Sequence, residues 1–200
     1  YWQKNVSKFL NKADPLITLK RKILFFKHYI FEKIASLHKE SLKRTIASTL
    51  SNSRLAKVYS YMVEKEILQI ITAEEGSRVV GSLSYKKSSR KTSMSNLIYL
   101  IYKSVPGFVR HPLVWFVELY FKIGLYKGIK SKLNIVTLFI DVDYQNKKIG
   151  QLLVDYIISE YKNDITVDTR SNNKTALNFY KKNQFVIVNE NVKNTVLKRS

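Results

Sequence analysis

The stretch IDVDYQNKKIG, residues 140–150, decides the fold, because it joins a predicted strand to a predicted helix. The strand covers residues 133–142 and the helix residues 149–161. A helix that opens directly after a strand presents unpaired main-chain N–H groups and the positive end of its dipole. A pyrophosphate binds such a turn through N–H groups alone. Lys147 and Lys148 add positive charge, so the sequence predicts an anion-binding turn here.

A second stretch, NKTALNFYKKNQF at residues 173–185, opens another predicted helix and ends where an apolar strand begins. The two stretches, in this order, resemble the GNAT superfamily of acyl-CoA-dependent N-acetyltransferases. The family's turn reads Arg/Gln-x-x-Gly-x-Gly/Ala, and Gln145 and Gly150 match its ends. The residues that match the family's second motif are Asn173, Ala176, Phe179, Tyr180 and Phe185.

Three positions depart from the family pattern. Lys148 stands where the family has its middle glycine, and Gln184 replaces the glycine before Phe185. Asn146 stands where many members have another glycine, and asparagine tolerates unusual backbone angles better than most residues. Close approach of a main chain to a phosphate favours glycine. The departures therefore leave two consequences open, a modest affinity for CoA or a distorted turn.

The resemblance implies acetyl-CoA as co-substrate and assigns roles to the matching positions. The main chain at Ile140 and Val142 would pair with the pantetheine arm, and Asn173 would help to fix that arm. Tyr180 would lie near the thioester sulfur. The residues whose main-chain amides would hold the pyrophosphate are Gln145, Asn146, Lys147, Lys148, Ile149, Gly150 and Gln151.

Tyr180 is the candidate catalytic residue. Attack of an amine on a thioester expels a thiolate, which a positioned acid protonates. A phenol with a pKa near ~10 supplies that proton once a thiolate forms beside it. The alternative interpretation is a core aromatic on a helix face, since the chain has 13 tyrosines.

No general base is evident from the sequence. Many family members carry Glu six residues before the position of Ile140, and here that place is Asn134, which cannot accept a proton. Glu118 is the only acid in residues 92–132, and His111 lies nearby. Both are expected more often in surface or structural roles than in catalysis.

Composition is that of one globular domain, with 45% apolar and 25% charged residues in 200. The chain has no cysteine and three histidines without a ligand-like spacing, so neither a disulfide framework nor a metal site is expected. A cysteine-free chain fits the cytoplasm. Residues 1–19, a basic extension, lack the features of a secretory signal.

The net charge of +20 is unevenly distributed. Residues 1–45 carry 11 Lys or Arg against three acids, residues 92–132 carry six against one, and residues 133–200 carry ten against seven. Such a field attracts nucleotide phosphates, nucleic acid or an acidic membrane surface. The alternative is the general bias of a lysine-rich proteome. Nucleic acid is not the expected partner.

The element order predicts an α/β fold of the GNAT type, with a mixed, mostly antiparallel sheet and helices on both faces. One domain would cover residues 1–200, with the acyl-CoA-binding core at 133–189. The other predicted elements are helices at 1–12, 23–38, 52–64 and 173–183, and strands at 16–20, 67–73, 79–85, 165–169, 185–189 and 194–198. A turn is expected at 74–77 and a loop at 86–94.

Residues 92–132 form an apolar helical insertion before the coenzyme-binding strand. Its apolar pieces, 97–102 and 113–125, are separated by Pro106-Gly107 and Pro112. They are too short and interrupted to span a membrane. Three interpretations remain: a buried helix, a lid on the acceptor pocket, or an amphipathic element in peripheral contact with an acidic membrane.

The insertion is similar to those of GNAT proteins associated with bacterial surface-polysaccharide synthesis, which would imply an amino-sugar nucleotide as acceptor. The leading hypothesis is therefore an N-acetyltransferase that acts on a small, anionic amine. One alternative is a protein or peptide N-acetyltransferase, which would need an open groove. The other is a catalytically inactive basic binding module on the same fold, suggested by Lys148 and Asn134.

Overall fold

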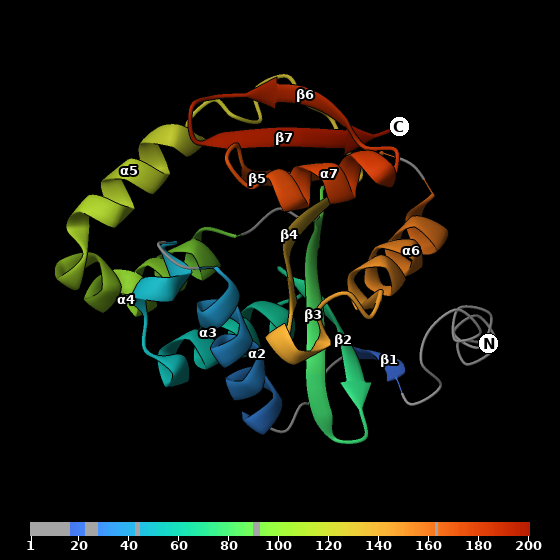
Figure 1. Cartoon of the computed structure of the whole chain (residues 1–200). Coiled ribbons are helices and arrows are strands. Elements are labelled where there is room, and N and C mark those ends of the chain that lie inside the picture. Colours follow the sequence, from blue (N-terminus) through green and yellow to red (C-terminus); the bar gives the residue numbers. More distant parts are fainter. Residues whose placement is uncertain (1–16, 23–27, 43–44, 90–92, 163) are drawn as a thin grey trace.

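The computed structural model of the chain describes residues 17–22, 28–42, 45–89, 93–162 and 164–200. The helix expected at 1–12, and the start of the one expected at 23–38, lie outside these residues. Within them, seven strands form one sheet in the order β1-β2-β3-β4-β5-β7-β6 (Figure 1). The strands are β1 Ile17–Lys22, β2 Gln69–Glu75, β3 Arg78–Lys87, β4 Leu133–Ile140, β5 Ile165–Arg170, β6 Val186–Glu190 and β7 Asn194–Arg199.

Neighbouring strands pair antiparallel throughout the sheet except for β4 and β5, which are parallel. The helices are α2 His28–Ser41, α3 Asn52–Glu64, α4 Met94–Arg110, α5 Pro112–Lys122, α6 Ile149–Tyr161 and α7 Lys174–Lys182, with 3₁₀ helices η1 Ala47–Thr49 and η2 Val142–Tyr144. The mixed, mostly antiparallel sheet and the helical insertion before β4 are confirmed.

Helices cover both faces of the sheet. Because successive strand residues point to opposite sides, neighbouring residues of one strand pack against different helices. Ile70 packs in a core with the apolar residues of α2 and α3, whereas Ile71, the next residue, packs in a second core with those of α6. Val79 and Val80 divide in the same way between the two cores. The sheet is therefore sandwiched between two helical layers, as expected from the sequence.

The insertion contains two helices whose boundary differs from the expected one. The sequence predicted a break at Pro106-Gly107, but α4 continues through both residues to Arg110. Only Pro112 begins a new helix, in the first turn of α5, where a missing N–H costs nothing. The interior Pro106 removes one main-chain hydrogen bond of α4.

Gly107 allows α4 to approach η1 closely. A Cβ at this position would lie 2.4 Å from Thr49 Oγ1 and 2.9 Å from Leu50 Cδ2. The indole Nε1 of Trp115 in α5 donates a hydrogen bond to the same Thr49 Oγ1 at 3.3 Å. A small residue inside α4 therefore permits one of the close contacts between the insertion and the body of the domain.

Candidate functional site

The site begins where β4 and β5 separate. The two strands pair only from Leu133 with Ile165 to Ile135 with Val167, although both continue further. The pairing of β4 with β3 has an irregularity at the same level, between Ser84 and Tyr85. Such a bulge bends a strand and increases its twist. The carboxyl-terminal halves of β4 and β5 therefore diverge and leave an opening in the middle of the sheet.

Main-chain groups of β4 face this opening. The N–H of Asp141 donates to the C=O of Val80 at 2.9 Å, so Asp141 faces β3. Alternation along an antiparallel ladder then turns the N–H and C=O groups of Ile140 and Leu138 toward β5, beyond the last β4–β5 pair. These two residues have the geometry to pair with an extended amide-containing ligand, which is the role predicted for Ile140.

Val142 lies elsewhere than expected. The strand predicted to reach residue 142 ends at Ile140, and Val142 begins η2 instead. The C=O of Val142 accepts from the N–H of Gln145 at 3.2 Å, and its side chain is 70% exposed. The side chain of Asp141 sets this turn by accepting from the N–H of Asp143 at 3.1 Å. The pairing of Val142 with a ligand stays a prediction. The main-chain groups of Leu138, rather than those of Val142, face the opening together with those of Ile140.

The turn before α6 is built from two residues in left-handed conformations. Asn146 has φ 64° and Lys148 has φ 58° and ψ 13°. Lys148 is the N-cap of α6, and its side chain makes no capping hydrogen bond. Glycine adopts these angles without strain, whereas lysine does so at a cost. Lys148 therefore occupies a left-handed backbone position that glycine would adopt without strain.

The N-terminus of α6 opens toward the exposed side of this turn. The first helical bond runs from the N–H of Leu152 to the C=O of Lys148 at 3.0 Å. The N–H groups of Ile149, Gly150 and Gln151 precede it and have no acceptor inside the helix. Ile149 is buried, whereas Gln145, Asn146, Lys147 and Lys148 are exposed. The arrangement fits an anion at the helix dipole.

Side chains around the turn are fixed by their neighbours. The ammonium group of Lys147 lies 4.3 Å from the ring centroid of Tyr144, a cation–π contact that holds the charge at the turn. The side-chain amide of Gln151 donates to Asp155 Oδ1 at 2.7 Å and to Asn183 Oδ1 at 2.5 Å. The side chain of Gln151 is therefore occupied, and only its main-chain N–H is available for the predicted contact with the pyrophosphate.

The second predicted motif forms α7. Asn173 is its N-cap, and Oδ1 of Asn173 accepts from the N–H of Ala176 at 3.0 Å. Asn173 and Ala176 both line the cavity that begins at the β4–β5 opening. The capping bond uses the carbonyl of the amide, so the Nδ2 group is the part of Asn173 suited to a ligand.

Tyr180, on the same helix, is buried with 4% of its surface exposed, yet it lines this cavity. Its ring packs edge-on against Phe179 and Phe185, with centroids 5.2 and 5.4 Å away. Burial, and next the negative charge of Asp168, raises the pKa of Tyr180. The phenol is therefore held in its protonated form. The structure is compatible with both interpretations of Tyr180, because its ring packs in the core and the residue also lines the cavity.

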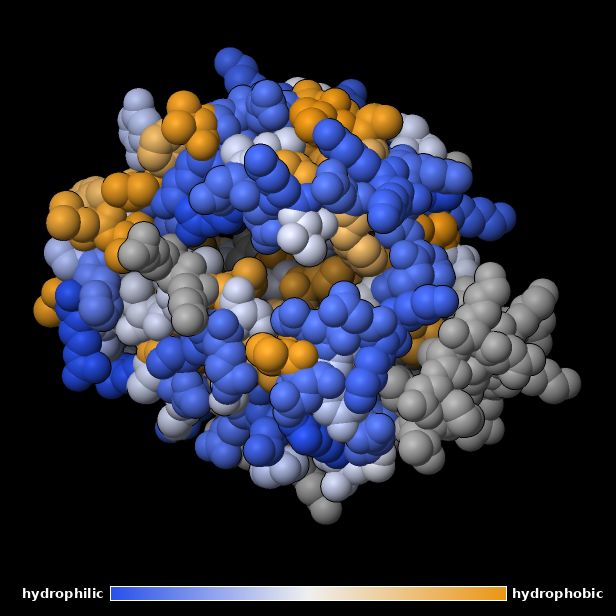
Figure 2. Space-filling view, viewed as in Figure 1, coloured by the Kyte–Doolittle hydropathy of each residue, from blue (hydrophilic) through white to orange (hydrophobic). Residues whose placement is uncertain are grey.

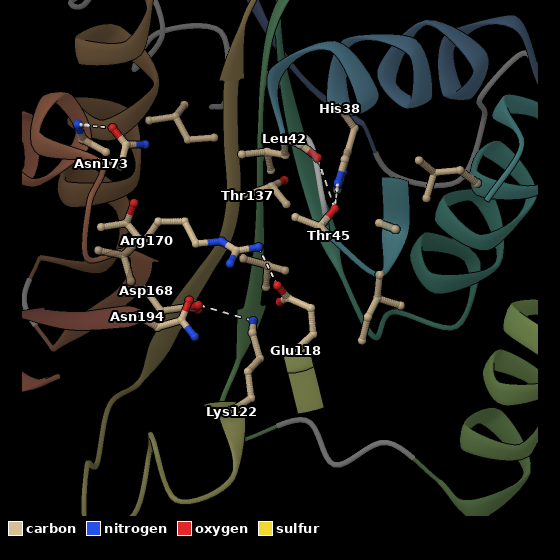
Figure 3. A pocket seen from close by; sticks show the side chains of 18 of the residues that line it. His38, Leu42, Thr45, Glu118, Lys122, Thr137, Asp168, Arg170, Asn173 and Asn194 are labelled. Atoms are coloured by element: carbon tan, nitrogen blue, oxygen red, sulfur yellow. Dashed lines mark hydrogen bonds and ion pairs between the residues drawn. The ribbon is translucent and has the colours of Figure 1, made fainter. Parts of the chain in front are cut away.

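The cavity has a volume of about 400 Å³, and its lining residues come from α2, η1, α3, α4, α5, β4, β5, α7 and β7. Figure 2 shows this face hollowed at its centre, with apolar surface inside and hydrophilic surface around it. Four charged side chains reach the cavity from two elements (Figure 3), namely Glu118 and Lys122 of α5 with Asp168 and Arg170 of β5.

The charged groups are paired across the cavity. Arg170 and the ammonium of Lys193 contact Oε1 of Glu118 at 2.5 and 2.7 Å. Lys122 lies 3.3 Å from Asp168, which also accepts a hydrogen bond from Tyr126. Glu118 is thus a buried structural anchor between α5 and the sheet.

The candidate bases differ in position. Glu118 lines the cavity, whereas His111 is exposed at the junction of α4 and α5 and does not line it. Asn134, in the position of the family's glutamate, donates from Nδ2 to Thr166 Oγ1 at 3.1 Å.

His38 is a cavity residue that the sequence did not single out for chemistry. It is 4% exposed, and burial lowers its pKa from 6.5 to about 4. Nδ1 of His38 lies 2.5 Å from the hydroxyl of Tyr59. Nε2 lies 3.5 Å from Thr45 Oγ1, a contact drawn in Figure 3. The imidazole is therefore neutral and ordered by hydroxyl groups. Its position next to Leu37, on the buried face of a predicted helix, was the only sequence signal.

Asn194, in β7, is the second such residue. It is 3% exposed and lines the cavity, and its Nδ2 has no hydrogen-bond partner among the described residues. A buried unpaired donor is costly, so the amide of Asn194 is suited to a polar atom of a ligand. Among those same residues, no group of three His, Asp or Glu side chains is placed to hold a metal ion.

Comparison with known proteins shows which of them share this fold and part of this sequence. A sequence model of the acetyltransferase (GNAT) domain family matches residues 107–187, which include the opening, the turn and α7. No curated protein sequence matches the chain significantly. Ard1 from Thermoplasma volcanium has a similar fold, with a TM-score of 0.56, 15% identity and coverage of 92% of this chain and 97% of that chain.

Arabidopsis thaliana NAA60 is similar in two complexes. With a bisubstrate analogue the TM-score is 0.57 at 13% identity, covering 92% of this chain and 98% of that chain. With acetyl-CoA it is 0.55 at 13% identity, covering 90% and 96%. At these identities the likeness concerns the fold. The chain therefore has the fold of the GNAT acetyltransferases, and its residues 107–187 carry the sequence pattern of a GNAT acetyltransferase domain.

Proposed function

We propose that the protein transfers an acetyl group from acetyl-CoA to a primary amine of a small acceptor. The observation that carries the proposal is that the cavity lined by Tyr180 adjoins the β4–β5 opening, and that β4 leads along the chain to the turn before α6. An anion-binding turn, a strand edge free to pair and a cavity beside that edge are what a long phosphate-bearing thioester needs. The domain match to a GNAT acetyltransferase supports the same reaction class.

The roles of the residues follow from this geometry. The N–H groups from Gln145 to Gln151 would hold the pyrophosphate, with Lys147 and Lys148 adding charge. Main-chain groups of Leu138 and Ile140 would pair with the pantetheine amides, and Nδ2 of Asn173 would help to fix that arm. Val142, exposed at the start of η2, would contact the arm at most where it leaves the opening.

The chemical step is an acyl transfer. The amine nitrogen attacks the thioester carbonyl carbon, the C–S bond breaks, and the sulfur leaves as a thiolate. The hydroxyl of Tyr180 would donate a proton, or a hydrogen bond, to this sulfur. The proton lost by the amine would pass to water or to a cavity group.

The wall of the cavity favours a small acceptor over a polypeptide. Ser104 of α4, with Glu118 and Lys122 of α5, lines one wall of the cavity, and we infer that this wall limits the length of the acceptor, whereas a peptide would require an open groove. The cationic field of the chain, with a net charge of +20, favours an anionic acceptor such as a nucleotide-linked amino sugar. A place in surface-polysaccharide synthesis, and a cytoplasmic location, stay predictions that rest on the sequence.

Binding and turnover test the proposal separately. Isothermal titration with acetyl-CoA is expected to show binding, and release of the CoA thiol is expected with a nucleotide-linked amino sugar. Faster release with a peptide amino terminus would establish the protein N-acetyltransferase alternative. Absence of binding at millimolar acetyl-CoA would overturn the proposal that the protein is an acetyltransferase. The alternative of an inactive binding module would then remain.

A further inference from the structure

The helices α4 and α5 expose an unusual amount of apolar surface. Gly107 is the only buried residue of α4 and Glu118 the only one of α5. The interpretation of the insertion as a buried helix is therefore wrong. The most exposed apolar or aromatic side chains between residues 98 and 120 are those of Ile98, Tyr102, Val109, Leu113, Phe116 and Tyr120, with 60, 68, 69, 78, 61 and 72% of their surface accessible.

These side chains follow helical spacing. Ile98 and Tyr102 are four residues apart, and Leu113, Phe116 and Tyr120 are three and four apart, so each helix presents an apolar stripe. Phe108 packs edge-on against Trp115 and Phe116, with centroids 6.0 and 5.7 Å away, and holds the two helices together. Apolar surface gathers at the left edge of Figure 2, where α4 and α5 lie in Figure 1.

The charges of this segment have one sign at the surface. Its cations are exposed except for Lys103, which is half-buried over the rings of Tyr99 and Tyr102. Its single acid, Glu118, is buried and paired. The cations of residues 93–132 are Lys103, Arg110, Lys122, Lys127, Lys130 and Lys132.

This combination selects among the possible occupants of the surface. Scattered exposed apolar residues are normal, but a contiguous apolar patch marks an interaction site. A second copy of the chain would bring the same cations face to face, which is unfavourable. An anionic lipid surface accepts both components, since apolar side chains enter the acyl boundary and Lys and Arg meet the headgroups.

The segment lies on a membrane in this arrangement and does not cross it. Within the described part of the chain, no helix combines the length and apolarity that a membrane span requires. We propose that the α4–α5 helical hairpin docks in the plane of an anionic membrane through its apolar stripes. Because Ser104 and Lys122 of this hairpin also line the cavity, docking would bring the acceptor side of the cavity to the lipid surface.

Vesicle sedimentation tests the proposal on the full chain. The wild-type protein is expected to bind mixed phosphatidylcholine–phosphatidylglycerol vesicles and to bind pure phosphatidylcholine vesicles much more weakly. The double variant Leu113→Ser/Tyr120→Ser, which changes neither a buried nor a cavity residue, is expected to lose at least roughly tenfold in partitioning. Val186→Ser/Val192→Ser is the matched control, because these side chains are 60 and 91% exposed on and beyond β6; it should bind as the wild type does.

A charge pair completes the experiment. Lys103→Gln/Arg110→Gln is expected to weaken binding to the anionic vesicles, and Lys181→Gln/Lys182→Gln, exposed on α7, is expected to change it much less. Equal binding to both vesicle types, or equal loss in the hairpin and control variants, would overturn the proposal. A dimer in solution that the Leu113→Ser/Tyr120→Ser variant abolishes would overturn it as well. Turnover of acetyl-CoA without vesicles tests the proposed activity independently.

Discussion

Tyr180 on α7 and Asp168 on β5 line the same cavity, and after burial the charge of Asp168 is the second cause that raises the pKa of Tyr180. Lys122 and Tyr126 hold the carboxylate of Asp168 in place. Burial, and next the neighbouring charge of Asp168, therefore keep the phenol of Tyr180 neutral. A neutral phenol suits a donor to a departing thiolate, although the raised pKa makes it a weaker acid than an ordinary tyrosine.

Replacement of Tyr180 by Phe keeps the ring packing and removes only the donor. We expect affinity for acetyl-CoA and the melting temperature to change little, and kcat to fall by on the order of 10²-fold. Calorimetry, thermal unfolding and turnover on one preparation measure all three. Tyr161→Phe, whose hydroxyl lies 3.1 Å from that of Tyr85 outside the cavity, is the control. Normal turnover in the folded Phe variant would reduce Tyr180 to a packing residue.

Lys148 separates a charge effect from a backbone effect. Ala keeps the Cβ at φ 58°, whereas Gly removes the strain. Both variants should raise KM for acetyl-CoA and leave kcat nearly unchanged, because the lysine adds only charge. Lys148→Gly alone should gain about 1 kcal/mol of stability, the strain relieved less the added entropy of the unfolded chain.

The double variant Lys147→Ala/Lys148→Ala should raise KM further with the same kcat. Urea unfolding and steady-state kinetics measure these differences. A large fall in kcat at saturating acetyl-CoA would mean that the lysines act in the chemical step.

Local patterns in the sequence predicted much of the fold. The helix expected at 52–64 was confirmed to the residue, since Ser51 accepts from the N–H of Arg54 and fixes its start. The turn expected at 74–77 was too long, because β2 continues to Glu75. Glu74 is buried there and accepts a hydrogen bond from Thr72 at 2.8 Å. From sequence alone, a glutamate at the end of a strand cannot be told from a turn residue, because the hydrogen bond that allows its burial is not visible there.

The candidate site, like the fold, could be predicted from the sequence only in part. The α6 turn and α7 could be predicted, because each is one continuous motif. The cavity could not, because it joins side chains from distant parts of the chain: His38 from α2, Glu118 from α5 and Asn194 from β7. The end of β4 was also missed, since a 3₁₀ turn that Asp141 stabilises removes Val142 from the strand.

Glu118 distinguishes a structural anchor from a general base. The Gln variant would leave Arg170 and Lys193 beside a neutral group in a buried site, which should cost roughly 3 kcal/mol of stability. Asp143→Asn is the matched control, because its pair with Arg78 at 3.3 Å is exposed and should cost less than about 1 kcal/mol. Urea unfolding measures both. A Gln variant of normal stability whose turnover is lost would instead identify Glu118 as the base.

His38 should make stability depend on pH. Its pKa is lowered from 6.5 to about 4 by burial, so below pH 6.5 the unfolded chain binds a proton that the folded chain does not. Stability is therefore full above pH 6.5 and falls as the pH drops toward 4. Between pH 7 and pH 5 the loss from this residue should be about 2 kcal/mol. Urea unfolding at the two pH values measures it. His38→Gln should remove this part of the loss, whereas His111→Gln, at an exposed position, should retain it. An unchanged pH dependence in His38→Gln would show that His38 is not the group that is buried in its neutral form.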